Sequence, residues 1–492
     1  MIALLAVLLA QAGAGPIRFG PQAPLPPEWV QPGSGSRATF INVKACIPSP
    51  TGCLFAVGDG VADDTAAIQA ALDAVAAGST VTLPQGSYVL SGVGTELLKI
   101  SKPLVLRGAG MTNTFLLVKS TVGASTDVIR LVGTAKMEGI VLADFDIAPQ
   151  SGTPGRHAIN VDTTNFAIDR LIIERLYISP LGGKGIISTN PTPITNGFFT
   201  STIRDNTIFG GILLQNAGDT IVIANNVITG LNTGVDASFV LGALNMTIRE
   251  NNITSTGAFI HLGSAASQVR IIYNEFEGTA GDTGSNGAKI DIDCASGGNI
   301  CKHVEFAGNL LSPVGAGLNG IRVNNAKHTN IHDNTFSRVS GTFDILTTAN
   351  ASNTNIGWNR YDPEPDTLVA NGLSDSGATT WYRANDLDTG VELLKNVKIG
   401  SGGTTISNSA RGLLNVGAPA AVGPGVCATI ATITVTAPAG TECQYGIPGV
   451  AALSYYCAIS ALNTCVVNGC NPAAAGNVTP TAGNYVCRAM SP

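Results

Sequence analysis

Charged residues are scarce in this chain of 492 residues. Only 12% of them are Asp, Glu, Lys or Arg, and the 27 Lys and Arg residues form no basic run that would follow a phosphate backbone. No pair of cysteines has the Cys-x-x-Cys spacing of a zinc site. No apolar run reaches the roughly 18 residues of a membrane-spanning helix. The sequence therefore predicts no nucleic-acid partner, no metal or other cofactor, and no membrane span.

A six-residue pattern recurs seven times between Ile203 and Tyr361. Each copy begins and ends with an apolar residue and has Asn at its fourth position. Successive Asn residues lie 20 to 35 residues apart, a spacing that indicates stacked structural repeats. The seven residues are Asn206, Asn226, Asn251, Asn274, Asn309, Asn334 and Asn359.

The copies are too short and too rich in β-branched residues to form helices, and they alternate as strands do. We predict an all-β fold, a right-handed parallel β-helix with coils of about 20–25 residues. Asn tolerates the left-handed backbone conformation, and its amide can both donate and accept hydrogen bonds. We therefore expect an internal Asn ladder at one turn of the coils. A β-sandwich with a chance Asn pattern is the alternative.

The residues before the repeat suit an anchor, a connector and a helix. Ile2–Ala10 is an apolar run that favours an uncleaved anchor over a signal peptide, because no basic residues precede it. Residues 16–39 are rich in Pro, Gly and Ser, as connectors are. Asp63 or Asp64 can begin an amphipathic helix that ends before Gly78. We expect this helix to cover the open end of the first coil.

The segments Gly58–Val75, Leu83–Tyr88 and Leu106–Gly110 resemble the beginning of the pectate-lyase-like β-helix superfamily, especially of bacteriophage tailspike and tail-fibre proteins. The preceding stretch Trp29–Ser36 is also similar to those of tailspikes, whereas the insertion between Cys46 and Cys53 departs from the pattern. The C-terminal residues resemble a small β-sandwich module of phage tail proteins. The predicted domains are an N-terminal anchor and connector (1–39), the β-helix (40–362), a neck (363–405) and a Cys-rich C-terminal β module (406–492).

The ten cysteines cluster locally, which favours disulfides and an oxidising environment. Cys294 and Cys301 close a loop with six intervening residues, two of them Gly, and we expect them to be bonded. Reduced thiols in a protein that assembles in the cytosol are the alternative.

Outward residues of a β-helix form columns, because equivalent residues of neighbouring coils lie about 4.8 Å apart. We align eight strands on their inward residues, from Ile159 through Ile321 to Phe343. The outward residues that follow are Asn160, Ile187, Leu213, Asp236, His261, Asp291, Arg322 and Asp344. Two positions further on lie Asp162, Thr189, Gln215, Ser238, Gly263, Asp293, Asn324 and Leu346.

Asp236, Asp291 and Asp293 are the predicted catalytic residues. Asp236 and Asp291 should lie about 10 Å apart and Asp291 and Asp293 about 7 Å apart, near the separation of the two carboxyl groups in inverting glycoside hydrolysis. Neighbouring charges should raise the pKa of at least one carboxyl group, which would give an acid and a base at the same pH. An ordinary solvated face is the alternative. The predicted substrate-binding residues are His261, Arg322, Asp344 and Asn324. Loops at 277–287 and 294–301 flank Asp291 and Asp293 and are expected to wall a groove there.

The resemblance to tailspikes implies a homotrimer that binds and hydrolyses a bacterial surface polysaccharide, such as capsule or O-antigen, during host recognition. Its N-terminus would attach to the other proteins of the virion, and it would act outside the cell. One alternative is an adhesive or structural spike without catalysis. Another is a secreted polysaccharide lyase, for which His261 or Arg322 would serve near an acidic sugar.

Overall fold

A computed structural model describes most of the chain from residue 40 onward. The predicted anchor and connector at 1–39 and most of the predicted neck lie outside the described residues. The described ranges are 40–49, 52–189, 197–214, 218–230, 233–238, 244–263, 266–278, 284–294, 300–312, 318–337, 344–362, 373–375, 380–383, 392–393, 397–398, 405–406, 411–416, 426–434, 442–446, 454–461, 464–471 and 483–490.

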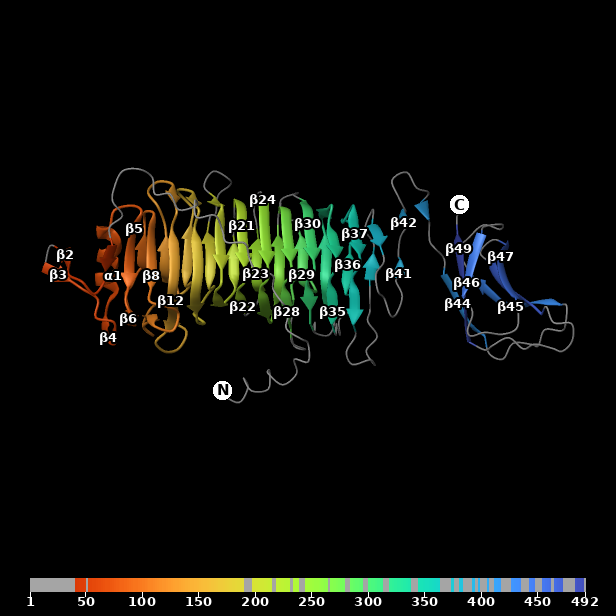
Figure 1. Cartoon of the computed structure of the whole chain (residues 1–492), viewed down its shortest axis with the longest axis horizontal. Coiled ribbons are helices and arrows are strands. Elements are labelled where there is room, and N and C mark those ends of the chain that lie inside the picture. Colours follow the sequence, from red (N-terminus) through yellow and green to blue (C-terminus); the bar gives the residue numbers. More distant parts are fainter. Residues whose placement is uncertain are drawn as a thin grey trace. The chain divides into compact units, whose positions relative to one another are not determined.

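The strands stack into a parallel β-helix (Figure 1). In one coil, β24 (Leu244–Arg249) and β25 (Asn252–Ser255) meet at a tight turn, and β26 (Ala258–Gly263) follows. They pair in parallel with the equivalent strands of the next coil. The predicted parallel β-helix is therefore confirmed. The equivalent strands are β27 (Ser267–Ile272), β28 (Glu275–Glu277) and β29 (Ala288–Asp293).

Two long sheets result, as far as the structure describes the chain. The first two strands of each coil form a 24-stranded sheet, here called sheet A, and the third strands form a 12-stranded sheet, here called sheet C. Besides β26 and β29, sheet C contains β7 (Glu96–Ile100), β10 (Asp127–Leu131), β13 (Ile159–Asp162), β16 (Ile186–Thr189), β20 (Ile212–Leu214), β23 (Thr233–Ser238), β32 (Asn319–Asn324), β36 (Ile345–Thr347), β39 (Leu373–Asp375) and β41 (Glu392–Leu393).

Sheet A has two sets of strands, which β12 and β15 join because each runs through both sets. The first set contains β24, β27, β1 (Phe40–Asn42), β5 (Ser79–Leu83), β8 (Leu104–Gly108), β12 (Val141–Pro149), β15 (Ile172–Ile178), β18 (Ser201–Arg204), β21 (Asp219–Ala224), β30 (Cys301–Ala307), β33 (Ala326–Lys327), β34 (Asn330–His332), β37 (Thr354–Gly357) and β40 (Thr380–Arg383). The second contains β25, β28, β4 (Asp59–Asp63), β6 (Gly86–Leu90), β9 (Thr114–Val118), β19 (Thr207–Phe209), β22 (Val227–Gly230), β31 (Leu310–Leu311), β35 (Thr335–Ser337) and β38 (Arg360–Asp362).

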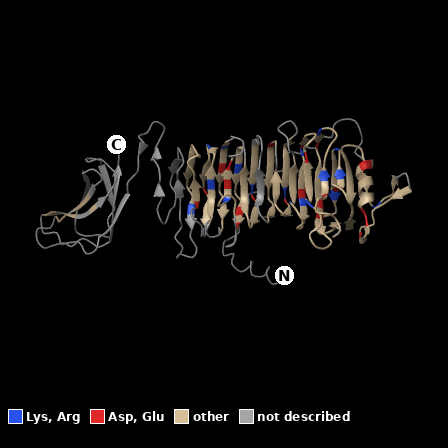
Figure 2. Cartoon of the chain, turned by 180° about the vertical axis from the view of Figure 1, so that it is seen from behind, with Lys and Arg blue, Asp and Glu red and all other residues tan. Residues whose placement is uncertain are grey.

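The core is a continuous stack of inward aliphatic residues. In sheet C, Ile260 pairs with Ile290 and Ile290 pairs with Ile321, and all three side chains are fully buried. Burial of a branched side chain contributes about 1.5–3 kcal/mol, so this column holds neighbouring coils together. The few Lys, Arg, Asp and Glu residues lie scattered over otherwise uncharged strands (Figure 2).

The predicted Asn ladder is present. The side-chain Nδ2 of Asn251 donates to Oδ1 of Asn274 at 2.9 Å, and Asn274 donates to Asn309 at 3.0 Å. The same arrangement links every successive pair from Asn206 to Asn359. One detail of the prediction is wrong, because the ladder residues do not adopt the left-handed conformation. The residue before each ladder Asn adopts it: Asp205, Asn225, Glu250, Tyr273, Gly308, Asp333 and Trp358.

A helix, α1 (Thr65–Ala74), precedes the second coil, near the predicted position. Its buried residues, including Ile68 and Leu72, join the same hydrophobic cluster as the first strands. Asp64 is the N-cap residue but makes no side-chain cap hydrogen bond. Its carboxylate instead accepts hydrogen bonds from the backbone N–H groups of Val57 and Gly58, at 2.6 and 3.1 Å, and so fixes the turn before β4.

Disulfides join Cys46 to Cys53, Cys294 to Cys301, and Cys427 to Cys470. The bond predicted between Cys294 and Cys301 is thus confirmed. The first closes the hairpin of β2 (Ile47–Ser49) and β3 (Gly52–Leu54).

Towards the C-terminus, the described strands include the hairpin of β42 (Val397–Lys398) and β43 (Thr405–Ile406) and two three-stranded antiparallel sheets. One sheet contains β44 (Arg411–Val416), β49 (Gly483–Met490) and β46 (Glu442–Gly446). The other contains β45 (Cys427–Thr434), β48 (Thr464–Cys470) and β47 (Ser454–Ala461). Besides sheets A and C, the β-helix has a small three-stranded sheet. It comprises β11 (Met137–Glu138), β14 (Ile168–Asp169) and β17 (Phe198–Phe199). Among the described residues, no helix is long and apolar enough to cross a membrane.

Candidate functional site

The outward column of sheet C has the predicted order over most of its length. Asp236 pairs with His261, His261 with Asp291, and Asp291 with Arg322. Asp293 pairs with Asn324 in the neighbouring column. The structure thus brings five of the predicted residues onto one face of sheet C. Asp236 lies on β23, the neighbouring strand, in register with His261.

The alignment of the last coil is wrong by two residues. Ile345 pairs with Ile321, so Leu346 takes the position beside Arg322 that was predicted for Asp344. Phe343, the predicted inward residue, lies outside the described residues. Asp344 is buried before β36, where its backbone oxygen accepts a hydrogen bond from the backbone N–H of Ile321. Asp344 is therefore not part of the outward column that contains Asp291 and Arg322.

Asp291 is the centre of the cluster and is fully buried. Its Oδ1 accepts a hydrogen bond from Arg322 Nη1 at 2.8 Å. Its Oδ2 accepts from Asn286 Nδ2 at 2.7 Å and from Ser285 Oγ at 3.1 Å. The two latter residues belong to the loop predicted to wall the groove, and they cover Asp291. This carboxylate can position its neighbours but presents no free face to a substrate.

Asp293 lies at the rim of the cluster, with 11% of its side chain exposed. Its Oδ2 accepts hydrogen bonds from Arg322 Nη1 at 2.8 Å and from Asn324 Nδ2 at 2.9 Å, and its Oδ1 accepts from Asn325 Nδ2 at 3.0 Å. Burial alone would raise the pKa of Asp293, but these hydrogen bonds and the Arg322 charge outweigh it and lower the pKa to about 2.

The predicted rise in carboxyl pKa is therefore wrong for Asp293. The prediction considered repulsion between the carboxylates and omitted the cation between them. The same guanidinium nitrogen of Arg322 contacts both Asp291 and Asp293, so attraction exceeds repulsion. Asp293 is ionised at neutral pH and cannot serve as a general acid.

His261 and Asn324 complete the cluster. His261 is 23% exposed, and its Nδ1 lies 2.8 Å from Ser285 Oγ and 3.4 Å from Asp291 Oδ2. Asn324 Oδ1 accepts hydrogen bonds from Thr348 Oγ1 and Asn350 Nδ2, which hold its amide toward Asp293. The exposed edges of His261, Arg322 and Asp293 thus offer fixed donors and one fixed anion to a polar ligand. Such rigid support is typical of binding sites.

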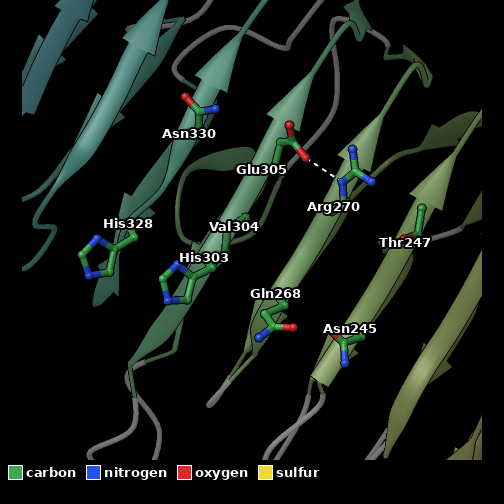
Figure 3. Close-up of a pocket in the computed structure, with 9 residues that line it drawn as sticks. All are labelled: Asn245, Thr247, Gln268, Arg270, His303, Val304, Glu305, His328 and Asn330. Carbon is green, nitrogen blue, oxygen red and sulfur yellow. Dashed lines mark hydrogen bonds and ion pairs between the residues drawn. The ribbon is translucent and has the colours of Figure 1, made fainter.

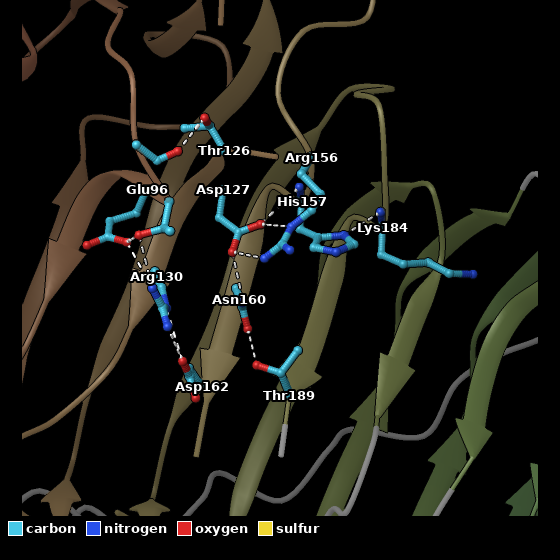
Figure 4. A network of polar contacts seen from close by, with 12 residues as sticks. Glu96, Thr126, Asp127, Arg130, Arg156, His157, Asn160, Asp162, Lys184 and Thr189 are labelled. Carbon is cyan, nitrogen blue, oxygen red and sulfur yellow. Dashed lines mark hydrogen bonds and ion pairs between the residues drawn. The ribbon is translucent and has the colours of Figure 1, made fainter. Parts of the chain in front are cut away.

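A second polar network lies on the same face of sheet C, in earlier coils (Figure 4). Asp127 is fully buried and accepts two hydrogen bonds from Arg156, at 2.8 and 2.7 Å. It also accepts one from Asn160 Nδ2 at 2.6 Å, and Asn160 Oδ1 accepts one from Thr189 Oγ1 at 2.9 Å. A paired and hydrogen-bonded buried carboxylate of this kind orients the groups around it.

Arg130 forms the other half of this network. It contacts Asp162 Oδ2 through Nε at 3.0 Å and Glu96 Oε2 through Nη1 at 3.0 Å. Burial alone would raise the pKa of Asp162, but hydrogen bonds from Thr164 and Arg130 outweigh it and lower the pKa. Asp162 and Arg130 are therefore both charged at neutral pH.

His157 lies beside this network. Its Nδ1 accepts a hydrogen bond from the backbone N–H of Lys184 at 2.9 Å, and the Lys184 side chain extends away from the other residues (Figure 4). Burial lowers the pKa of His157, although Asp127 opposes this effect. The neutral ring therefore carries its proton on Nε2 and can donate it to a ligand.

Asn160, Asp162 and Thr189 lie in the outward columns predicted from the sequence, but they were not predicted to form a site. The apolar Ile187 and Leu213 interrupt these columns, and β10, which carries Asp127 and Arg130, precedes the strands that were aligned. An alignment extended by one coil would have added Arg130 to the outward column beside Asn160. No group of three His, Cys, Asp or Glu residues suited to a metal ion occurs in the part of the chain that the structure describes.

Parts of this chain are similar in sequence to known proteins, and its fold is similar to a solved structure. The family model "Rhamnogalacturonase A/epimerase, pectate lyase-like" matches residues 55–178, which include Asp127, Arg130 and Asp162. Mannuronan C5-epimerase AlgE5 of Azotobacter vinelandii is 48% identical over 86 residues, 16% of this chain and 8% of that protein. Alginate lyase 7 of the same organism is 41% identical over 108 residues, 20% of this chain and 12% of that protein. The chain thus spans only about a tenth of the length of these curated relatives.

Among solved structures, the Dettilon tailspike protein (gp208) is similar to 91% of this chain and 93% of its own, with a TM-score of 0.53 and 13% identity. At this identity the likeness concerns the fold. The structure thus shows a parallel β-helix fold that this chain shares with a phage tailspike, and residues 55–178 are similar to a pectate-lyase-like family.

Proposed function

We propose that this protein binds a bacterial surface polysaccharide, such as capsule or O-antigen, along the outer face of sheet C and hydrolyses it. The observation that carries the proposal is the cluster in which Arg322 bridges Asp291 and Asp293 beside the exposed edge of His261. Long polymers suit a face on which equivalent residues recur about every 4.8 Å. The likeness of the whole fold to a tailspike supports the proposal.

The residues have different roles in this proposal. Asp293 is the ionised carboxylate, and it stabilises positive charge at the anomeric carbon or accepts a proton from the attacking water. Asp236, two coils before Asp291 in the same column, is the candidate general acid. Asp291 is a positioning residue that holds Arg322. His261 and Asn324 bind sugar hydroxyl groups.

A second candidate function is C5-epimerisation or lyase cleavage of a uronic-acid polysaccharide. It is favoured by the sequence match to mannuronan C5-epimerases and alginate lyase 7. It is also favoured by the network of Arg130, Arg156 and His157 within the matched family segment. A cation beside a sugar carboxylate stabilises the charge that develops when a base removes the C5 proton. Return of a proton to the opposite face gives the epimer, and loss of the C4 oxygen gives an unsaturated sugar.

For assembly and location, we propose a homotrimer that is attached to a virion through residues 1–39 and acts outside the cell. A secreted protein is the alternative. Light scattering of the full chain measures the mass directly, and a monomer at all concentrations would contradict the trimer. An adhesive spike without catalysis would also form trimers, so this measurement does not replace an assay of activity.

The decisive experiment incubates the full-length protein with purified capsular polysaccharides, O-antigens and alginate. New reducing ends without unsaturated products support hydrolysis. Unsaturated products indicate a lyase, and inversion at C5 without shortening indicates an epimerase. Binding without any product would leave an adhesin. Absence of binding to every polymer would overturn the proposed function as a whole.

A further inference from the structure

A groove of about 440 Å³ lies on sheet A (Figure 3). The cluster around Asp291 lies on sheet C. It crosses β24, β27, β30 and β34 and the connection between β33 and β34. We call it the sheet A groove. Its lining residues are Asn245, Thr247, Gln268, Arg270, His303, Val304, Glu305, His328 and Asn330.

The upstream edge of the groove is a row of polar side chains, one from each coil. Asn245, Gln268, His303 and His328 all have left-handed backbone conformations, with φ between 54° and 59°. This shared conformation repeats the same side-chain position in successive coils. The rings of His303 and His328 consequently stack, with centroids 4.9 Å apart and planes inclined by 6°.

The floor of the groove combines opposite charges with amides. Arg270 Nε donates to Glu305 Oε2 at 2.6 Å, as the dashed line in Figure 3 marks. Burial alone would raise the pKa of Glu305, but Arg270 outweighs it and lowers the pKa, so Glu305 is ionised. The Arg270 side chain is 56% exposed, so its remaining N–H groups face solvent. Vicinal hydroxyl groups of a sugar need such adjacent donors and acceptors.

An exposed aromatic ring lies at the end of β27, three residues after Arg270. Tyr273 is 65% exposed, and its ring lies over Gly308 of the next coil. A Cβ atom at Gly308 would lie only 2.5 Å from the Tyr273 ring, so the absence of a side chain there allows this placement. A ring supported on one side and open to solvent can stack against the apolar face of a pyranose.

We propose that the sheet A groove and Tyr273 form a second, non-catalytic binding surface for a segment of the same polysaccharide. This inference rests on the proposed function, since both surfaces take one polymer. A protein partner fits less well, because Val304 is the only aliphatic residue in the lining and stable protein interfaces have an apolar core. Two attachment surfaces on one chain raise the affinity for a long polymer through effective concentration.

The test uses the full-length protein and the polymer of the capsule, O-antigen and alginate panel that binds it most tightly, with oligosaccharides prepared from that polymer. Calorimetry should give two oligosaccharides per parent chain and one per chain for Tyr273→Ala and for the double variant His303→Ala/His328→Ala. Affinity for the polymer should fall at least tenfold in both variants. Tyr273→Phe retains the ring and should restore both values. Phe55→Ala, which removes an exposed ring before the first sheet C strand of the β-helix, should match the parent.

The possible failures are distinguishable. If the parent binds no polymer, the proposed function fails and this inference fails with it. If the parent binds but both variants keep the parent stoichiometry and affinity, only the second surface is refuted. If the variants change the molecular mass in light scattering while the oligosaccharide stoichiometry stays at the parent value, the groove is a contact between copies of the chain and the inference is overturned. Circular dichroism and melting curves identify a variant that has not folded, and Gln268→Ala then replaces it.

Discussion

The Nη1 atom of Arg322 lies 2.8 Å from Oδ2 of Asp293. The same nitrogen lies 2.8 Å from Oδ1 of the fully buried Asp291, so one guanidinium group bridges carboxylates on the neighbouring strand. Arg322 is itself only 16% exposed. Charges this close and this poorly solvated hold one another in place.

Asp293→Asn and Asp236→Asn should each reduce polysaccharide turnover by about two orders of magnitude or more, because they keep shape but remove ionisation. Binding of the polymer should largely remain. The measurement is release of reducing ends from the polymer that the parent cleaves. Glu275→Gln, an exposed change on sheet A, is the matched control and should keep the parent rate. Parent rates in both Asp variants would place the reaction elsewhere.

Arg322→Leu should destabilise the protein by about 3–5 kcal/mol, because it leaves the buried carboxylate of Asp291 without its cation. The double change Arg322→Leu/Asp291→Leu removes both charges and should recover part of this loss. Urea unfolding measures the free energy of unfolding. Arg249→Leu breaks the more exposed pair with Glu250 and should cost less than about 1 kcal/mol. An equal loss in the free energy of unfolding for the two Arg variants would show that Arg322 does not stabilise the buried Asp291 carboxylate.

Asn251→Ala should cost about 2–4 kcal/mol, since it interrupts the ladder. Asn251 donates to Asn274 Oδ1 and to the backbone oxygens of Ile223 and Arg249, and it accepts from Asn226. The side chain of its neighbour Asn252 makes a long hydrogen bond to Glu275, at 3.4 Å, so Asn252→Ala is the control and should cost less than about 0.5 kcal/mol. Thermal melting of the two variants should separate them clearly. Overlapping melting curves would show that the ladder does not stabilise the coils.

Asp146→Asn should change how stability depends on pH. Asp146 is 7% exposed, its Oδ1 has no hydrogen-bond partner, and burial raises its pKa to about 7. Because the folded pKa lies above the unfolded pKa, ionisation costs stability as pH rises from about 4 to 7, and the cost persists above 7. The variant should therefore be more stable than the parent at pH 8, by on the order of 2 kcal/mol, and nearly equal to it at pH 4.

Melting temperatures across this pH range test that prediction. Asp73→Asn, on the exposed face of α1, is the control and should follow the parent profile. Ionisation of Asp293 should have the opposite effect on folding stability, because its folded pKa of about 2 is below the unfolded value. Its ionised form stabilises the fold above about pH 4, and this contribution is lost as pH falls through 2. A parent-like profile for Asp146→Asn would show that the Asp146 carboxyl is solvated.

The repeated Asn and its apolar neighbours were enough to predict the coils and the ladder. Equivalent turns that stack on one another carry the same residue in each coil. The spacing of that residue in the sequence therefore predicts a solenoid fold. The alignment of Asp236, His261, Asp291 and Arg322 followed for the same reason, because a strand alternates strictly and its inward residue identifies its outward neighbour.

The register of the last coil could not be predicted from the sequence. Phe343 and Ile345 are both apolar and two positions apart, so alternation alone cannot choose between them. Pairing of Ile345 with Ile321 decided the register and removed Asp344 from the column. The backbone conformation of the turn also could not be predicted from the sequence. A six-residue pattern does not show whether Asn251 or Glu250 adopts the left-handed conformation.

The sequence by itself therefore determined the coils, their order and which residues share a face. Only the tertiary structure decided how those residues interact. Burial of Asp291 under Ser285 and Asn286, and the contact of one Arg322 nitrogen with two carboxylates, depend on loop paths and side-chain rotamers. Asp127 and Arg156, 29 residues apart, pair for the same reason. Residue spacing specifies columns, whereas charge and protonation depend on distances of a few ångströms that only packing sets.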